Sequence, residues 1–229
     1  MRRLSTLLSA LLLVAACSTP QVLPVGISDP PGSAVDARLE GTWVRVEAAP
    51  EQPGPAQTGW AAILQILPSP DGSFDATVSA MAARTPAGGA ATGEDSGGPE
   101  SEPAAIWYWA ALAGYGSDLD GRTYYNLRVV EAWSVEKPAG KPGKGQVPQE
   151  IPKPGAGFLI ARTRFSASGL LRVDLISDGY FEKSGIDPGT ITRAGLTDLL
   201  HTANPDALFG FSLGVFRRVD GNDPAQPDD

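Results

Sequence analysis

Residues 73–81 alternate strictly between apolar and polar side chains, and this stretch constrains the fold more than any other part of the chain. The apolar positions are Phe74, Ala76, Val78 and Ala80. A period of two residues is typical of a β-strand that buries one face and exposes the other. The triplet Pro70-Asp71-Gly72 comes just before and favours a turn, because proline presets φ and glycine tolerates positive φ. We therefore expect an antiparallel sheet with one covered face.

Short runs of β-branched and aromatic residues recur along the chain and are separated by turn signals. They cover residues 42–48, 59–67, 106–112, 123–133, 158–165, 170–177 and 208–219. Asp120-Gly121 and residues 166–169 lie between neighbouring runs and favour hairpin connections. The pattern predicts an all-β fold of about eight antiparallel strands, arranged as a sandwich or a barrel.

One segment has helical periodicity instead. Leu196, Leu199 and Leu200 fall on one side of a helix over residues 193–203. Thr192 comes just before this segment, and its hydroxyl can accept a hydrogen bond from a free backbone N–H of the first turn. The sequence predicts one short helix in the C-terminal region, packed over an end or open side of the sheet. Residues 180–184 fit a further single turn less well.

Composition sets the limits of the domain. Residues 17–37 are rich in Pro, Gly and Ser, which is typical of a flexible linker. Residues 84–104 and 136–157 hold few apolar side chains, so they cannot bury enough surface to offset the entropy of ordering. We expect one β-barrel domain over residues 38–220, disordered loops in those two stretches, and a disordered tail over 221–229.

The first 17 residues have the pattern of an export signal. Arg2 and Arg3 come before an apolar run from Leu4 to Val14, which is too short to span a bilayer, and small residues follow it. The tetrapeptide Val14-Ala15-Ala16-Cys17 resembles the lipobox of bacterial lipoproteins. The resemblance implies that residues 1–16 are removed and that Cys17 receives a diacylglycerol and an acylated amine. The alternative is an ordinary signal peptide in which Cys17 has no special role.

This resemblance also predicts a location. A lipidated Cys17 implies a protein anchored in a membrane of the cell envelope and facing the periplasm, and Ser18 after the cysteine suggests the outer membrane. Loss of Arg2 and Arg3 changes the formal charge from −8 to −10, which argues against nucleic acid as a partner. Cys17 is the only cysteine, so disulfides and cysteine-based metal sites are not expected. No metal and no cofactor are predicted.

Three features suggest chemistry, but a structural role suits each of them better. Ser212 lies in a G-x-S-x-G pattern, yet the single histidine, His201, comes before it, and strand-like residues follow where a nucleophile elbow needs a helix. Asp118 and Asp120 resemble the start of a calcium loop, but Leu127 stands where the bidentate Glu belongs. We expect a structural role for His201, a hairpin turn at Asp120, and no catalytic residue, so the protein is not expected to be an enzyme.

Aromatic residues gather in the middle of the chain. If some of their rings face into a wide barrel, they could line a site for a small apolar ligand. The candidates are Trp107, Trp109, Tyr125 and Trp133. The alternatives are an aromatic core or rings on the outer surface.

A second resemblance concerns the first strand. Gly41-Thr42-Trp43 is similar to the G-x-W motif that opens the barrel of lipocalins and related calycins. In that group an arginine late in the chain packs across the tryptophan and closes one end. Arg217 or Arg218 is in position to do so here, by a cation-π contact. Residues 39–220 also resemble a group of small bacterial lipoproteins, and the resemblance implies a calycin-like barrel.

Two functions follow as expectations. The first is a tethered module that binds a small apolar ligand inside the barrel. The second is a structural or assembly lipoprotein that docks another component of the cell envelope. A filled barrel interior favours the second function, and a large apolar cavity favours the first.

Overall fold

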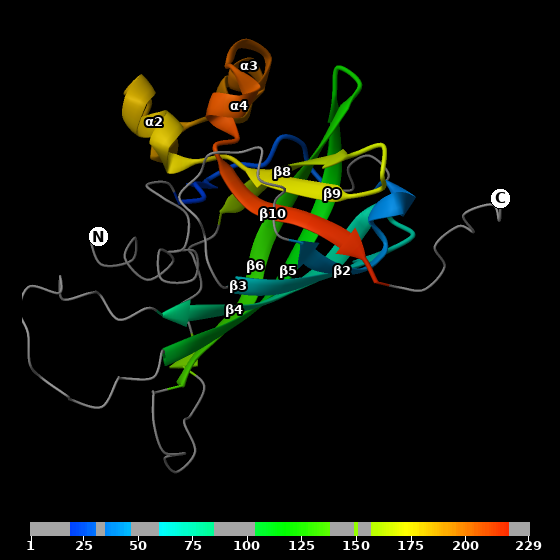
Figure 1. Cartoon of the computed structure of the whole chain (residues 1–229). Coiled ribbons are helices and arrows are strands. Elements are labelled where there is room, and N and C mark those ends of the chain that lie inside the picture. Colours follow the sequence, from blue (N-terminus) through cyan, green and yellow to red (C-terminus); the bar gives the residue numbers. More distant parts are fainter. Residues whose placement is uncertain are drawn as a thin grey trace, which may run out of the picture.

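The computed structural model describes residues 19–30, 35–46, 60–84, 104–137, 149–150 and 157–219. Eight strands form a closed antiparallel barrel (Figure 1). They are β2 (Gly41–Val46), β3 (Trp60–Pro68), β4 (Ser73–Arg84), β5 (Ala104–Leu119), β6 (Arg122–Lys137), β8 (Phe158–Phe165), β9 (Leu171–Leu175) and β10 (Phe211–Arg218). The barrel closes because β8 pairs with both β9 and β6, while β10 pairs with β2. The predicted all-β barrel is confirmed, and it is compatible with a lipocalin-like fold.

Two short strands extend the barrel wall. The strand β1 (Val22–Leu23) pairs with β8, and β7 (Gln149–Glu150) pairs with β6. Both are antiparallel. The expected loop over 136–157 therefore contains a strand, and most of its other residues, like most of 84–104 and the tail, lie outside the described residues.

The predicted turns have the backbone geometry that their residues suggest. Asp120 and Gly121 connect β5 and β6 with φ values of 52° and 72°, and a two-residue hairpin of type I′ requires positive φ at both positions. Gly169 has a φ of 75° in the turn between β8 and β9. The hairpin interpretation of Asp120-Gly121 is confirmed.

The barrel interior contains one contiguous core. Every strand of the barrel contributes to this cluster of buried side chains, which includes Trp43, Ile66, Phe74, Leu127 and Phe216. An eight-stranded barrel is just wide enough for side chains to fill it. The packing around Gly114 is close: a Cβ there would lie 2.5 Å from the Phe74 ring and 2.9 Å from Leu127.

Short helices cover one end of the barrel (Figure 1). They are α2 (Asp178–Ser184), α3 (Arg193–Thr202) and α4 (Pro205–Leu208), and the 3₁₀ helix η2 (Pro188–Thr190) lies between α2 and α3 in the chain. The other 3₁₀ helix, η1 (Ala37–Leu39), lies elsewhere, just before β2 and next to Trp43. The Thr192 hydroxyl accepts a hydrogen bond from the Gly195 N–H, so the predicted cap of α3 is observed. The sequence predicted α3 and, as the weaker expectation, a further turn over residues 180–184; α2 confirms that turn, and the structure adds α4, which was not expected. The size of α4 explains why it was missed, because four residues do not complete two helical turns and show no period in the sequence.

Residues 19–30 pack against the barrel, which corrects the expectation of a flexible linker over 17–37. Besides the β1 pairing, the Ile27 N–H donates a hydrogen bond of 2.7 Å to the side-chain oxygen of Asn126, which is fully buried. Leu23 and Ile27 join a second apolar cluster between the barrel and the helices. The Pro and Gly content did not predict the packing of this segment, because its order comes from contacts with distant strands.

Candidate functional site

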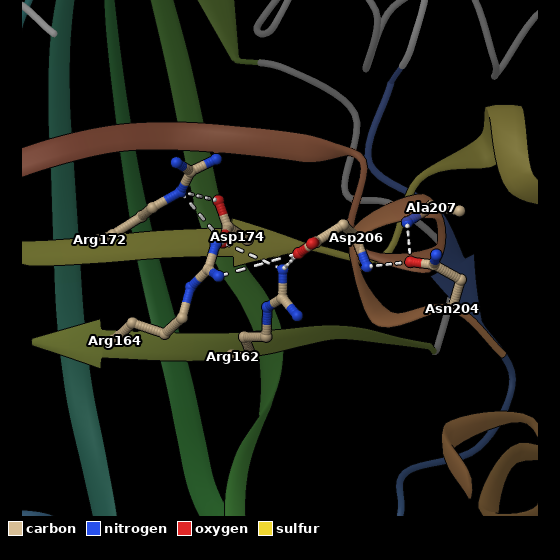
Figure 2. A network of polar contacts seen from close by, with 7 residues as sticks. All are labelled: Arg162, Arg164, Arg172, Asp174, Asn204, Asp206 and Ala207. Carbon is tan, nitrogen blue, oxygen red and sulfur yellow. Dashed lines mark hydrogen bonds and ion pairs between the residues drawn. The ribbon is translucent and has the colours of Figure 1, made fainter. Parts of the chain in front are cut away.

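The most concentrated polar cluster lies on the outer wall of β8 and β9. Alternate residues of a strand face opposite sides, so inward Ala161 and Val173 leave their neighbours Arg162 and Asp174 facing outward. Arg164 and Arg172 stand opposite each other in the same ladder, as do Arg162 and Asp174. Asp206 on α4 completes this arginine cluster (Figure 2).

Asp174 is the centre of the arginine cluster. Its side chain is fully buried and receives Arg164 Nη2 at 2.9 Å, Arg172 Nε at 2.9 Å and Arg162 Nη2 at 3.5 Å. A buried carboxylate is stable only when charge and hydrogen bonds compensate for lost water. The three guanidinium groups supply both, which explains why an acid is tolerated beneath the helices.

Arg162 connects the barrel wall to α4. Its Nη2 lies 2.9 Å from Asp206 Oδ1, and its guanidinium carbon lies 4.8 Å from the centre of the Phe209 ring. The Arg162 hydrogen bond lowers the pKa of the Asp206 carboxyl below its usual value. Asn204 begins α4 by accepting hydrogen bonds from the N–H groups of Asp206 and Ala207 (Figure 2). The cluster thus fixes a four-residue helix that could not persist alone.

The chemistry of the arginine cluster is that of a structural charge network. Three cations face two carboxylates, and Asp206 is the more exposed of the acids, with 76% of its side chain accessible. Guanidinium groups do not titrate near neutral pH, so they offer neither a nucleophile nor a general base. The cluster holds α4 against the wall formed by β8 and β9.

Trp43 and an arginine of β10 form the contact that the calycin resemblance implies. Arg218 pairs with Trp43 across β10 and β2, and its guanidinium carbon lies 5.9 Å from the indole centre. Arg217 pairs with Val44 and faces the other side. The Trp43 Nε1–H donates to the Leu39 carbonyl at 2.9 Å. Gly41, with a φ of 121°, starts the strand in a conformation that favours glycine.

The four aromatic residues proposed to line a ligand site do not lie together. Tyr125 faces inward, where its ring meets Phe74 edge-to-face at 5.7 Å, and burial raises the pKa of its phenol. Trp107, Trp109 and Trp133 face outward instead, and 51% of Trp107 is exposed. One residue thus belongs to the core and three belong to the outer surface.

The outward residues form a mostly apolar surface across four strands, with Ser79 as its one polar member. One row of paired positions joins Ile63, Ser79, Trp109 and Trp133, and the next joins Ala61, Met81, Trp107 and Val135. These eight residues are called the tryptophan face below. Ile63 is 48% exposed, and the Trp133 Nε1–H donates to Glu131 Oε1 at 2.7 Å, which fixes that indole.

The remaining sequence candidates have structural positions. Ser212 lies at a bulge where the β10–β9 register shifts before Gly214, whose φ is 130°. His201 Nε2 lies 2.8 Å from Asp120 Oδ2, so it links the end of α3 to the β5–β6 turn. Within the described ranges, no group of three or more His, Cys, Asp or Glu residues is placed to hold a metal ion. Cys17 lies outside the described residues.

Sequence reasoning missed the arginine cluster and left open whether the three tryptophans face inward or outward. The signal for the cluster was present: Arg162, Arg164, Arg172 and Asp174 all occupy the polar positions of one predicted hairpin. Pairing the two strands around the turn at 166–169 would have placed the acid beside the arginines. No comparable signal identified Asp206, because its contact with Arg162 spans 44 residues.

Comparison of the chain with protein-family models, with curated proteins and with solved structures found no match. None of the helices in the described part of the chain is long and apolar enough to cross a membrane.

Proposed function

We propose that this protein is a lipid-anchored docking module of the cell envelope, which binds a protein partner through the tryptophan face. The observation that carries the proposal is the uncovered apolar surface on β3–β6, where Ile63 and Trp107 are each about half exposed. Contiguous exposed apolar surface on a folded domain commonly marks an interaction site. The sequence resemblance of Val14–Cys17 to a lipobox supplies the anchor.

The packing of the barrel supports external rather than internal binding. Each of the eight strands contributes buried side chains to the core, and the space beside Gly114 is occupied by Phe74 and Leu127. A small ligand inside this part of the barrel would have to displace core side chains, which costs several kcal/mol. We therefore favour docking over storage of an apolar molecule.

The composition of the tryptophan face supports a protein as partner. Its eight positions include three tryptophans, a methionine and an isoleucine, and none carries a charge. The buried centres of protein–protein interfaces are enriched in Trp and Met and depleted in Lys, Glu and Asp. Large aromatic side chains also carry a disproportionate share of binding energy.

Photo-crosslinking in cells tests this proposal. A crosslinking amino acid at Ser79, in the middle of the tryptophan face, should give one protein adduct. The double substitution Trp107→Thr and Ile63→Thr should abolish the adduct while changing the free energy of unfolding by only about 0.5 kcal/mol, because both side chains are exposed.

Leu67→Thr is the matched control. Leu67 is 54% exposed on the same strand as Ile63 but lies outside the two rows of the tryptophan face. The adduct should survive this substitution. An adduct that persists in the double variant, or that Leu67→Thr also removes, would contradict docking through the tryptophan face.

A further inference from the structure

We propose that the helical end of the barrel rests directly on the membrane surface, with no flexible spacer between the lipid anchor and the folded domain. The inference rests on the proposed lipid anchor at Cys17 and adds the orientation in which the barrel is held. The surface concerned surrounds Thr19, Asp178 and Ala207, and its partner is the headgroup layer of a bilayer.

Thr19 is tied to the start of α2 by reciprocal hydrogen bonds. The Thr19 N–H donates to Asp178 Oδ1 at 2.7 Å, and the Asp178 N–H donates to the Thr19 carbonyl at 2.9 Å. The Thr19 hydroxyl donates to the second oxygen of the same carboxylate. Three bonds between two residues hold the chain at this point.

The residues after Thr19 continue this attachment without a break. Pro20 forms a β-bridge with Ser177, and the Gln21 N–H donates to the Ile176 carbonyl at 2.8 Å. Val22 and Leu23 then pair with β8, and Leu23 is fully buried. Releasing this segment to serve as a spacer would break the ladder and expose Leu23, so it stays in place.

Covalent geometry then limits the distance to the anchor. Cys17 lies two residues before Thr19, and two residues of extended chain reach at most about 7 Å. The headgroup layer of a bilayer is itself roughly 5 to 8 Å thick on each side. Acyl chains on Cys17 that enter the hydrocarbon core would therefore bring Thr19 to the level of the headgroups.

The neighbours of Thr19 define which part of the barrel faces the lipid. The Ser177 N–H donates to the Leu208 carbonyl at 3.0 Å, which places the end of α4 beside the start of α2. A Cβ on Gly210 would lie 3.4 Å from Ser177 Cβ. Ala207 is exposed, and its carbonyl oxygen would lie 3.3 Å from the same Cβ on Gly210.

Fluorescence quenching in vesicles tests the orientation. The lipidated protein is reconstituted in phosphatidylcholine vesicles that contain a lipid with a nitroxide on its headgroup. One variant carries Ala207→Cys at the helical end. The other carries Ser168→Cys in the exposed turn between β8 and β9, at the opposite end of those strands from Ser177. Each new cysteine is labelled with a thiol-reactive fluorophore.

We expect several-fold stronger quenching at position 207 than at position 168. A spacer of about twelve glycine and serine residues between Ser18 and Thr19 adds roughly 20 Å of flexible reach. In that variant the difference between the two labels should disappear. Equal quenching at both positions in the protein without the spacer, while it remains bound to vesicles, would overturn the orientation and leave the anchor intact.

The parent protein distinguishes a failure of the anchor from a failure of the orientation. A lipidated Cys17 has no free thiol, so the parent protein should take up no fluorophore and should sediment with the vesicles. Labelling of the parent protein together with loss of vesicle binding would refute the anchor, and the orientation with it.

Discussion

The two ends of the β5–β6 hairpin differ in what lies over the outer face of the barrel. Near the Asp120-Gly121 turn, residues 19–30 cover the outer face, and Asn126 is buried there with its side chain fully hydrogen-bonded. Toward the far end, the outer face is apolar and leaves half of Trp107 exposed. The outer face of the hairpin is polar where residues 19–30 cover it and mostly apolar at the far end, where no described segment lies over Trp107.

This contrast indicates that burial of an outer face by the chain's own segment goes with a specific polar contact. A covered polar residue such as Asn126 specifies which segment lies over it, since the Ile27 N–H must meet its oxygen. The tryptophan face has no such internal partner among the described contacts of its exposed members. Trp107 is 12 residues from the end of β5, a distance of about 40 Å along the strand. The apolar surface therefore lies far from the helices that cover the other end.

Among substitutions on the covered outer faces, removal of the buried acid of the arginine cluster should destabilise the protein most. Asp174→Ala leaves Arg162, Arg164 and Arg172 without their shared carboxylate, and like charges then repel each other. We expect a loss of about 3 kcal/mol in the free energy of unfolding, at the lower end of the range for broken buried pairs because Arg164 and Arg172 can reach water. Urea denaturation measures it. Asp206→Ala, at an exposed carboxylate, should cost much less. Equal losses would contradict a central role for Asp174.

Asn126→Ala should lower the free energy of unfolding by a somewhat smaller amount. The substitution removes the acceptor for the Ile27 N–H and the donor to Ser117 Oγ at 2.7 Å. Leaving buried groups unpaired should cost about 2 kcal/mol. Hydrogen exchange of the Ile27 amide should quicken more than that of amides in β9. Unchanged protection of Ile27 would mean that apolar contacts alone hold the N-terminal segment.

The arginine pair at the end of β10 sharpens the comparison between inner and outer positions. Arg218→Ala removes the contact with Trp43 and should cost about 1 kcal/mol, while Arg217→Ala should stay within about 0.5 kcal/mol. Thermal unfolding of the two variants measures the difference. Equal losses of stability in the two variants would show that the contact between Arg218 and the Trp43 indole does not stabilise the fold.

The smallest expected effect is a change in the pKa of Asp206. Its pKa is lowered by Arg162 in the folded protein, so the contact stabilises the fold above the usual carboxyl pKa and is lost as pH falls through the lowered value. NMR titration should give an Asp206 midpoint below that of an ordinary aspartate. Arg162→Gln should return it toward the usual range. A midpoint that Arg162→Gln leaves unchanged would assign the shift to another group.

The strands were predictable because their side chains report which face is covered. The alternation over 73–81 became β4, and the turn residues at 120–121 and 166–169 became hairpins. The same alternation does not say which of two faces points inward. The sequence therefore left open whether Trp107, Trp109 and Trp133 face inward or outward. Their register decides it, because Trp109 pairs with Ser79, which pairs in turn with the exposed Ile63.

Contacts between distant segments were beyond the reach of local pattern. Residues 19–30 have the composition of a linker, yet Thr19 bonds to a residue 159 positions later. Asp206 meets Arg162 for the same reason, through folding rather than through sequence spacing. Both features depend on the closed barrel, which brings the start of the chain and the helices before β10 to one end.

Barrel closure also determines when the protein can finish folding. The ladder between β2 and β10 joins Trp43 to Arg218, about 175 residues apart in sequence. To form such a long-range contact, the chain loses the entropy of loop closure before the contact stabilises it, and folding is therefore slow. The first barrel strand thus has one edge unpaired until the last strand has been synthesised. Until then that open edge can pair with other chains, so slow passage through this state favours aggregation over folding.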